Sequence, residues 1–513
     1  IKGHSVSGLF VYEQFESLGS TLGASRTNFP FTSIDQLFAG GDDEEQSNWG
    51  NPSQDARKGF IGRFNYDYKG KYLAEFSFRY DGSLKFHPDR RWGFFPSVSL
   101  GWRLSEEAFM KKFSNLDNLK IRGSYGILGN DAVGGWQWLT NYSFGDAYIF
   151  NQAPIKSIVS GGIPNVDLTW EKTSTFNLGV DASIYKGLLS VEADVFYKRT
   201  YDILGSRNAS MPQTFGATLP SENYGVVKVK GFELQVKHDN KIGDFRYHVG
   251  GNVSWARNKV IERDYAAGIE PWNNPIGKTM GYRACFVALG LFQSDDEAAA
   301  WPRFKGTQPT AGDVKYADLN NDGIMDERDK KVVSPYSNTP EIMFGLNLSA
   351  SWKGFDFSAL FQGAANRNVM LSGFATQMFV NGSSNLPKYL YDDRWTPDNR
   401  DARYPKAWGP DHPSNNKAST FWLINGNYVR LKNMELGYSI PKVLLSKVGV
   451  ERLRVYVGGT NLFSIDHMPG YDPEKQDGGP NYYPQQRVFN MGVNITFSVS
   501  YTHLRAHETS AHL

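Results

Sequence analysis

The sequence of 513 residues has little of three features that commonly identify a protein class. It contains a single cysteine, Cys285, which excludes an intramolecular disulfide framework and a cysteine zinc cluster. Its formal net charge is only +2, so no charge excess indicates a nucleic-acid partner. It also has no apolar run of about 18 residues, so no transmembrane helix is predicted. A transmembrane β-barrel remains open, because its strands alternate apolar and polar residues.

Aromatic residues and glycine, in contrast, are abundant. Aromatic side chains make up 14% of the chain, which also contains 52 glycines. This composition is typical of many strands whose ends meet a membrane interface, although large glycan-binding β-proteins share it. The chain is also longer than one ordinary soluble domain. Composition therefore favours a large β-protein and leaves its location open.

Residues 176–197 show the pattern on which the fold prediction rests. Apolar side chains occupy every second position from Phe176 to Ile184, and the alternation restarts at Leu189 after a tight turn. Because successive side chains of a strand point to opposite faces, one face is apolar and the other polar. The residues that we expect to face lipid are Phe176, Leu178, Val180, Leu189, Val191 and Val195.

Similar alternation recurs along the chain and predicts about 14 strands. They span residues 4–16, 60–68, 71–80, 94–104, 119–128, 176–184, 189–197, 223–238, 245–260, 342–352, 355–362, 428–440, 453–465 and 488–497. Connections after the even-numbered strands are short, and those after the odd-numbered strands are long except after the third. Outer-membrane barrels place short turns on the periplasmic side and long loops outside. The sequence therefore predicts an all-β fold, a transmembrane antiparallel β-barrel with long extracellular loops.

Three local predictions accompany this assignment. A long loop is expected from residue 17 to about residue 56, with one helical turn at 31–38. A short helix is expected at 105–109, with Ser105 as its N-cap. Residues 281–293 are strand-like, but counting them as a membrane span would break the alternation of short and long connections. They are therefore assigned to a hairpin inside an extracellular loop.

Several sequence motifs point to one family. They are WEKT and NLGVD within 170–181, RWGFFPSVSLGWR at 91–103, LKIRGSYG at 119–126, GDVKYADLNNDG at 312–323, YVRLKN at 428–433 and the closing FNMGVNITF at 489–497. These stretches resemble the SusC/RagA family of TonB-dependent outer-membrane transporters and occur in the family's order. The likeness covers nearly all of residues 1–497.

The resemblance implies a barrel of roughly 22 strands that is filled by an N-terminal plug. Residues 1–497 would then form about 14 C-terminal strands of that barrel. The plug, the TonB-contacting segment and the first strands would lie outside this sequence. Residues 498–513 break the alternation and are interpreted as a non-native tail that resembles a translated sequencing adapter.

The family also implies a function. We expect TonB-dependent import of a bulky nutrient, an oligosaccharide or peptide, across the outer membrane of a Gram-negative cell of the Bacteroidetes type. The expected partners are TonB, a SusD-like surface lipoprotein that acts as a lid, and outer-membrane lipid. No catalytic residue and no nucleic-acid contact are predicted. The alternative is a secreted β-rich protein that binds or degrades glycans.

The segment from Asp318 to Asp329 matches the calcium-binding loop of EF-hands. Oxygen ligands at alternate positions converge on one hard cation, and Gly323 supplies the tight turn. The predicted ligands of a structural Ca²⁺ are Asp318, Asn320, Asp322, the carbonyl of Ile324, Asp326 and Asp329. The alternative interpretation is an Asp/Asn-rich turn without an ion.

Two further sets of residues complete the candidate site. Aromatic faces suit sugar rings, so loop tryptophans are the candidate substrate contacts, although each could equally anchor the packing of its loop. They are Trp136, Trp138, Trp272, Trp301, Trp395 and Trp408. The residues predicted to face the lumen are Glu75, Arg79, Arg103, Asp181, Glu192, Asp194 and Lys198. Glu192 and Asp194 are interpreted as part of this polar wall rather than as a glycosidase pair.

Overall fold

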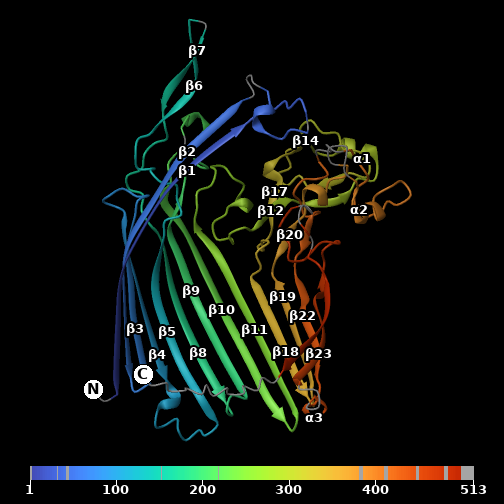
Figure 1. The fold of residues 1–513 in the computed structure, drawn as a ribbon. Coiled ribbons are helices and arrows are strands. Elements are labelled where there is room, and N and C mark those ends of the chain that lie inside the picture. The colour runs from blue at the N-terminus through green and yellow to red at the C-terminus, as the bar shows by residue number, and fades with distance from the viewer. Residues whose placement is uncertain are drawn as a thin grey trace, which may run out of the picture.

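The structure, a computed structural model, is dominated by one antiparallel sheet of 14 strands (Figure 1). It describes residues 3–31, 33–41, 46–151, 153–217, 219–379, 385–409, 414–445, 450–478, 483 and 485–497. The predicted tail at 498–513 lies outside these described residues. Neighbouring strands of the sheet follow one another in chain order, so the sheet has no crossover.

The sheet contains all the strands that alternation predicts. They are β1 (His4–Ser25), β2 (Ser47–Tyr68), β3 (Tyr72–Ser83), β4 (Trp92–Arg103), β5 (Leu116–Asn130), β8 (Glu171–Ile184), β9 (Leu189–Gly205), β10 (Glu222–Ile242), β11 (Phe245–Glu262), β18 (Ile342–Trp352), β19 (Phe355–Ala365), β22 (Tyr428–Ser439), β23 (Val450–Asp466) and β24 (Val488–Phe497). The prediction of an antiparallel β-sheet of about 14 strands is confirmed.

The prediction of a long loop at 17–56 is wrong. β1 and β2 are each 22 residues long and stay in register from His4 opposite Tyr68 to Ser25 opposite Ser47. Backbone hydrogen bonds form this part of the hairpin without an apolar face, so the sequence carries no alternation there. The helical part of this connection is the 3-10 turn η1 (Leu37–Ala39).

Two other local predictions need correction. The turn after β4 is a 3-10 helix, η2 (Leu104–Glu106), whose N-cap is Arg103, so Ser105 lies inside the turn and does not cap it. Residues 281–293 lie outside the main sheet, as predicted, but they do not form a hairpin. β12 (Arg283–Phe286) pairs with β17 (Lys330–Ser334), and β13 (Ala288–Leu291) pairs with β15 (Val314–Tyr316). These partners are distant in sequence, so local alternation could not identify them.

The ends of the strands differ sharply. At one end, short turns join β2 to β3, β8 to β9, β10 to β11 and β18 to β19, and the N-terminal end of β1 lies there too (Figure 1). At the other end, long connections run through residues 131–170, 263–341 and 366–427. This is the alternation of short periplasmic turns and long extracellular loops that the sequence predicts.

The connections on the long-loop side contain small elements of their own. These are β6 (Tyr142–Phe150), β7 (Ala153–Ser160), η3 (Gln213–Phe215), η4 (Pro271–Asn273), α1 (Asp295–Ala300), β14 (Arg303–Phe304), β16 (Ile324–Met325), η5 (Glu327–Asp329), β20 (Asn368–Met370), η6 (Gly373–Ala375), α2 (Lys388–Asp392) and β21 (Leu423–Asn425). α3 (Lys442–Leu445) lies at the short-turn end (Figure 1). No helix in the described part of the chain is long and apolar enough to cross a membrane.

Three long loops pack together around buried cores. We call these loops, residues 263–341, 366–427 and 467–478, the loop platform. One core contains Met378, Leu390 and Trp422, all fully buried, and it joins the second and third of these segments. A second core joins Phe286 to Val314, Tyr316 and Met325 within the first segment. The platform is therefore a packed structure at the extracellular end of the sheet rather than a set of separate loops.

The outward face of the sheet carries aromatic side chains in two rows. Near the short turns, the ring of Tyr72 lies 6.3 Å from the rings of Tyr68 and Trp102. Further along β3, Tyr80 stacks on Trp92 at 4.9 Å. The eight positions from 72 to 80 correspond to about 27 Å of strand, or about 20 Å of membrane thickness at the usual tilt. Two aromatic rows at this separation are typical of the two membrane interfaces.

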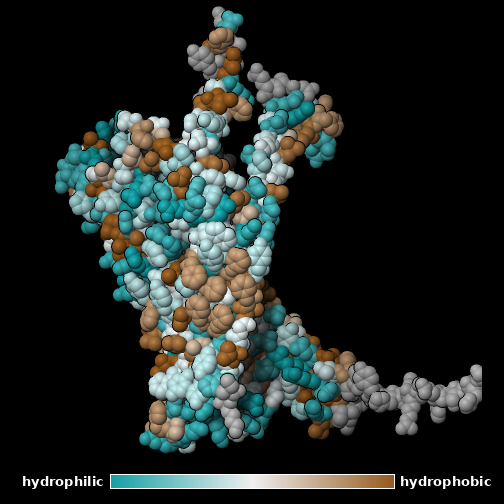
Figure 2. All heavy atoms as spheres, turned by 90° about the vertical axis from the view of Figure 1, so that its left-hand side faces the viewer, coloured by the Kyte–Doolittle hydropathy of each residue, from teal (hydrophilic) through white to brown (hydrophobic). Residues whose placement is uncertain are grey.

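The apolar surface lies between these rows. Figure 2 shows hydrophobic residues gathered across the wall, with hydrophilic residues above and below them. On the neighbouring strands, Phe176, Leu178 and Val195 have half-exposed side chains on the same face as Tyr125. A large exposed apolar surface on a folded sheet is stable only against another apolar phase, which here is lipid.

We predict that an arginine at Val180, in the middle of this apolar surface, lowers the free energy of unfolding in bilayers by roughly 2–4 kcal/mol. The penalty arises because the guanidinium group would have to enter hydrocarbon. The measurement is equilibrium unfolding of the full-length protein from liposomes. The control is Asn177→Arg, which places the same charge on the opposite face. Equal loss of stability in both variants would contradict the assigned facing.

Candidate functional site

The seven residues predicted to face the lumen all lie on one face of the sheet. Directly opposed residues of neighbouring strands share a face, and the register follows Arg103 opposite Lys120, Lys120 opposite Asp181 and Asp181 opposite Glu192. The same rule places the remaining four on that face, namely Glu75, Arg79, Asp194 and Lys198. It is the face opposite the aromatic rows, and we call it the inner face.

Charges on the inner face are paired. Arg122 lies between two carboxylates: its Nε donates to Asp181 Oδ1 at 3.0 Å and its Nη1 donates to Asp194 Oδ1 at 2.6 Å. Near β24, Arg454 binds Asp356 and Glu435 in the same way. Charge-assisted hydrogen bonds of this kind hold both partners in one geometry. The wall therefore offers many polar groups but little local charge excess.

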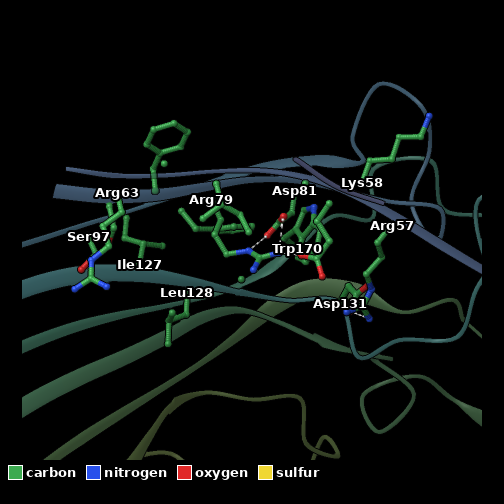
Figure 3. Close-up of a pocket in the computed structure, with 18 of the residues that line it drawn as sticks. Arg57, Lys58, Arg63, Arg79, Asp81, Ser97, Ile127, Leu128, Asp131 and Trp170 are labelled. Carbon is green, nitrogen blue, oxygen red and sulfur yellow. Dashed lines mark hydrogen bonds and ion pairs between the residues drawn. The ribbon is translucent and has the colours of Figure 1, made fainter. Parts of the chain in front are cut away.

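A cavity of about 1050 Å³ opens on the inner face of the N-terminal strands (Figure 3). Arg79 crosses its wall and donates to Asp81 Oδ2 at 2.8 Å and to Glu13 Oε2 at 3.0 Å. Further along, Arg57 Nη2 donates to Asp131 Oδ1 at 2.6 Å. These side chains come from β1, β2, β3 and the residue after β5, and β4 contributes Phe95 and Ser97, so the cavity depends on five adjacent strands of the sheet.

Trp170 lines this cavity, between Arg79 and Arg57 (Figure 3). Its ring packs against Phe86 at 5.6 Å and Phe95 at 5.2 Å, and its Nε1 donates to the carbonyl of Arg91 at 2.8 Å. No sequence pattern marked Trp170, Arg57 or Asp131 as a site residue. The signal available for Trp170 was its position at the start of the WEKT motif, directly before the alternation begins.

The candidate tryptophans have different positions. Trp136 is 37% exposed and lies 6.1 Å from the ring of Trp138, which in turn contacts His87. Trp395 and Trp408 are only 8% and 6% exposed, so packing is the role that the structure gives them. Their burial leaves little ring surface for a substrate.

Trp272 and Trp301 brace the loop platform. The Nε1 of Trp272 donates to the carbonyl of Lys330 at 2.9 Å, and that of Trp301 donates to the carbonyl of Tyr316 at 2.8 Å. The ammonium group of Lys315 lies 3.8 Å from the centre of the Trp301 ring. Of the six candidates, Trp136 is the one whose side chain is exposed.

Arginines attach the loop platform to the barrel wall. Arg430 of β22 is 4% exposed, and its guanidinium group binds Asp472 at 3.0 Å and Glu474 at 2.9 Å. Arg283 forms two bonds of 2.7 Å to Asp477 and so joins the first and third segments of the platform. None of these residues was singled out from the sequence, because their carboxylate partners lie about 40 or more positions away.

The predicted calcium loop is folded around one arginine. Arg328 Nη2 contacts Asp322 Oδ2 at 2.5 Å and Asp326 Oδ2 at 2.9 Å, and this pairing lowers the pKa of Asp326. Asp329 is fully buried and accepts the backbone N–H groups of Leu319 and Asp326, each at 2.9 Å. The carboxylates are therefore held by Arg328 and by backbone donors.

The other predicted calcium ligands lie in the same turn. Asp318 Oδ2 accepts the N–H of Gly323 at 2.9 Å, while its Oδ1 is buried without a hydrogen-bond partner. Asn320 Oδ1 accepts the N–H of Asp322 at 3.2 Å, and Ile324 begins β16. Among the described residues, no three carboxylate, histidine or cysteine side chains gather in metal-binding geometry. The calcium site stays a prediction, and one free oxygen of Asp318 is the feature that fits it.

Comparison with known proteins assigns the family. Residues 6–462 match the family of TonB-dependent receptor-like β-barrels. The chain belongs to this family. Its TonB-dependent receptor relatives include receptor P26 of Formosa agariphila, 30% identical over 85% of this chain and 46% of the relative. SusC of Bacteroides thetaiotaomicron is 27% identical over 85% of this chain and 43% of its own length. This is a SusC/RagA-type TonB-dependent receptor, and its sheet is part of an outer-membrane β-barrel.

A solved structure agrees with this fold. The RagAB peptide importer in its open-open state superposes with a TM-score of 0.77 at 24% identity, covering 97% of this chain and 53% of the importer chain. The chain spans about half the length of the relatives that it matches. The predicted SusC/RagA likeness, the β-barrel fold and the outer-membrane location are confirmed.

Because Arg122 of the receptor neutralises two carboxylates, we predict that Arg122→Met lowers the free energy of unfolding by about 1–3 kcal/mol, the cost of leaving a partly buried acceptor without its donor. Asp194 has only 14% of its side chain exposed and would lose its cation. The measurement is equilibrium unfolding in denaturant. The control is Arg63→Met, whose pair with Glu75 is more exposed and should contribute about 0–1 kcal/mol. A smaller loss of unfolding free energy in Arg122→Met than in Arg63→Met would contradict the stabilising role given to the Arg122 pairs.

We propose that one Ca²⁺ orders the loop at 312–333, and we expect chelation to raise its protease sensitivity while the barrel stays intact. Arg328→Gln should enlarge this effect, because Asp322 and Asp326 lose the cation that now neutralises them. The measurement is limited proteolysis with and without chelator, and the control is Lys330→Gln, which pairs with Glu327 beside the cluster. Unchanged cleavage together with no retained calcium would leave only the turn interpretation.

Proposed function

We propose that the complete receptor imports a bulky nutrient, an oligosaccharide or a peptide, across the outer membrane. The observation that carries this proposal is the inner face: a broad polar wall with paired charges and a cavity of about 1050 Å³. Such a wall forms hydrogen bonds with a large polar molecule without holding it by net charge. A bulky hydrated substrate can therefore slide past it.

Energy and gating come from parts of the receptor beyond this barrel segment. The two edge strands of the sheet, β1 and β24, each have one neighbour among the described residues. Unpaired backbone groups are not tolerated in hydrocarbon, so we infer that further strands complete the barrel. In the complete receptor a plug fills the barrel and TonB acts on that plug, as the family implies.

The loop platform suits the docking of a SusD-like surface lipoprotein. Its cores are buried, and Arg430 and Arg283 fasten it to the wall and to itself. A rigid rim is what a lid needs, because a mobile rim would have to be ordered at each closure. One solved structure with the same fold is the RagAB peptide importer.

Substrate contact is assigned to the Trp136–Trp138 pair. Its rings lie in the loop between β5 and β8, and Trp136 keeps the larger exposed surface. Stacking of a sugar ring or of an aromatic peptide side chain on these faces requires no bond making or breaking. Import is therefore proposed without covalent chemistry, and the receptor is proposed not to be an enzyme.

The secreted alternative does not fit the outer surface. Two aromatic rows flank an exposed apolar surface, which a water-soluble glycan-binding protein would have to bury. The family assignment points in the same direction. We therefore retain outer-membrane import as the single proposed function.

The test is growth of the host after deletion of the receptor gene. We expect growth to fail on one class of oligosaccharide or on peptides as sole source, and to return with the wild-type gene. Trp136→Ala with Trp138→Ala should slow uptake of that substrate at least severalfold. The control is Trp352→Ala, an exposed tryptophan at the opposite end of the sheet. Unchanged growth of the deletion strain on every oligosaccharide and peptide source would overturn the proposal.

A further inference from the structure

A second cavity, of about 630 Å³, lies at the extracellular ends of β10 and β11. Five of its lining residues are basic and none is acidic. The basic residues come from two strands and from the loop platform, and they are Lys228, Lys230, Arg257, Lys259 and Lys278. We call this site the basic cavity. It shares no lining residue with the cavity on the inner face.

The strand register places the four basic side chains of β10 and β11 on the outward face of the sheet, whereas Val229 and Asn258, which also line the cavity, lie at inner-face positions. Lys230 lies directly opposite Arg257 on one side and Tyr197 on the other. Two positions after Lys230 on β10, closer to the short turn and on the same face, Phe232 lies opposite Trp255 and Val195. Those three residues belong to the apolar surface that faces lipid. The lysines therefore continue a lipid-facing row, and they do not point into the lumen.

The level of the cavity in the membrane follows from the aromatic rows. Tyr247 stacks on His238 at 5.4 Å, near the short turns, and Trp255 lies eight positions further along β11. The same eight positions separate Tyr72 from Tyr80 in the two rows described above. Trp255 is thus in the extracellular aromatic row. Lys230 and Arg257 lie about 7 Å beyond it along the strands, at the level of the lipid headgroups.

The charge of the basic cavity is largely uncompensated. Arg257 is paired with Glu341 through two hydrogen bonds of 2.7 Å. Lys228, Lys230 and Lys259 form no ion pair with any residue that the structure describes, although Lys228 and Lys259 lie directly opposite each other. Like charges at this spacing repel and disfavour the folded arrangement. An anion from outside the chain would remove that cost.

We propose that the basic cavity binds the phosphate headgroup of a lipid in the outer leaflet, with the acyl chains lying along the outward face beside Phe232 and Trp255. Phosphate offers several strong acceptor oxygens to converging ammonium and guanidinium donors. A lipid explains the position as well as the charge, because the cavity begins where the apolar surface ends. The site is independent of the proposed import function.

The test uses the full-length receptor in a non-ionic detergent. It is titrated with bis-phosphorylated lipid A and, separately, with the same lipid after removal of both phosphates, and bound lipid is counted by native mass spectrometry. We expect the phosphorylated lipid to bind wild-type receptor roughly tenfold or more tightly. The variant Lys228→Gln, Lys230→Gln, Lys259→Gln should lose this preference.

The control variant neutralises three lysines of the inner face, Lys120→Gln, Lys198→Gln and Lys237→Gln, with the same change in net charge. It should keep the wild-type preference. Equal binding of the two lipids by wild type would overturn the proposal without reference to any variant. Equal loss in both variants would overturn the location. Displacement of the lipid by equimolar inorganic phosphate would assign the cavity to a free anion instead.

Discussion

Every backbone N–H and C=O group that crosses hydrocarbon must find its hydrogen-bond partner inside the protein, and the rest of this structure depends on that requirement. The continuous ladder of 14 strands meets it without a crossover. Because side chains alternate between the two faces, the same ladder sorts residues into a lipid face and a lumen face. A slip of one residue would exchange the two faces. The register that places Asp181 opposite Glu192 therefore also keeps Val180 and its apolar neighbours on the lipid face.

The two faces of the sheet differ in how their charged side chains are paired. On the inner face, arginines such as Arg122 and Arg454 lie between carboxylates, so the wall is polar but locally balanced. On the outward face, beyond the aromatic row, lysines gather without carboxylates. A balanced wall suits the passage of a large hydrated molecule, whereas an unbalanced cluster suits a fixed anion. One sheet thus carries two kinds of polar surface, one on each face, because side chains alternate between the faces along every strand.

The loop platform is stabilised in a different way from the sheet. Its small strands pair with segments far away in sequence, and its stability comes from buried cores around Trp422 and Phe286. Buried Arg430 connects it to the barrel through Asp472 and Glu474, and removing one partner of such a cluster leaves an unpaired buried charge. The platform is therefore coupled to the barrel wall, which makes it a firm base for a partner at the extracellular rim.

The sequence by itself determined the strands, their facing and the alternation of short turns with long loops. These features depend on local alternation with a period of two, so that β8 and β9 end and begin at Ile184 and Leu189 as predicted. Alternation disappears above the membrane, and there the predictions of a long loop at 17–56 and of a hairpin at 281–293 were wrong. Only the tertiary structure decided that Trp395 and Trp408 are buried, that Trp170 lines a cavity and that Lys278 joins the lysines of β10 and β11. Each of these depends on contacts between segments distant in the chain, and no local pattern encodes such contacts.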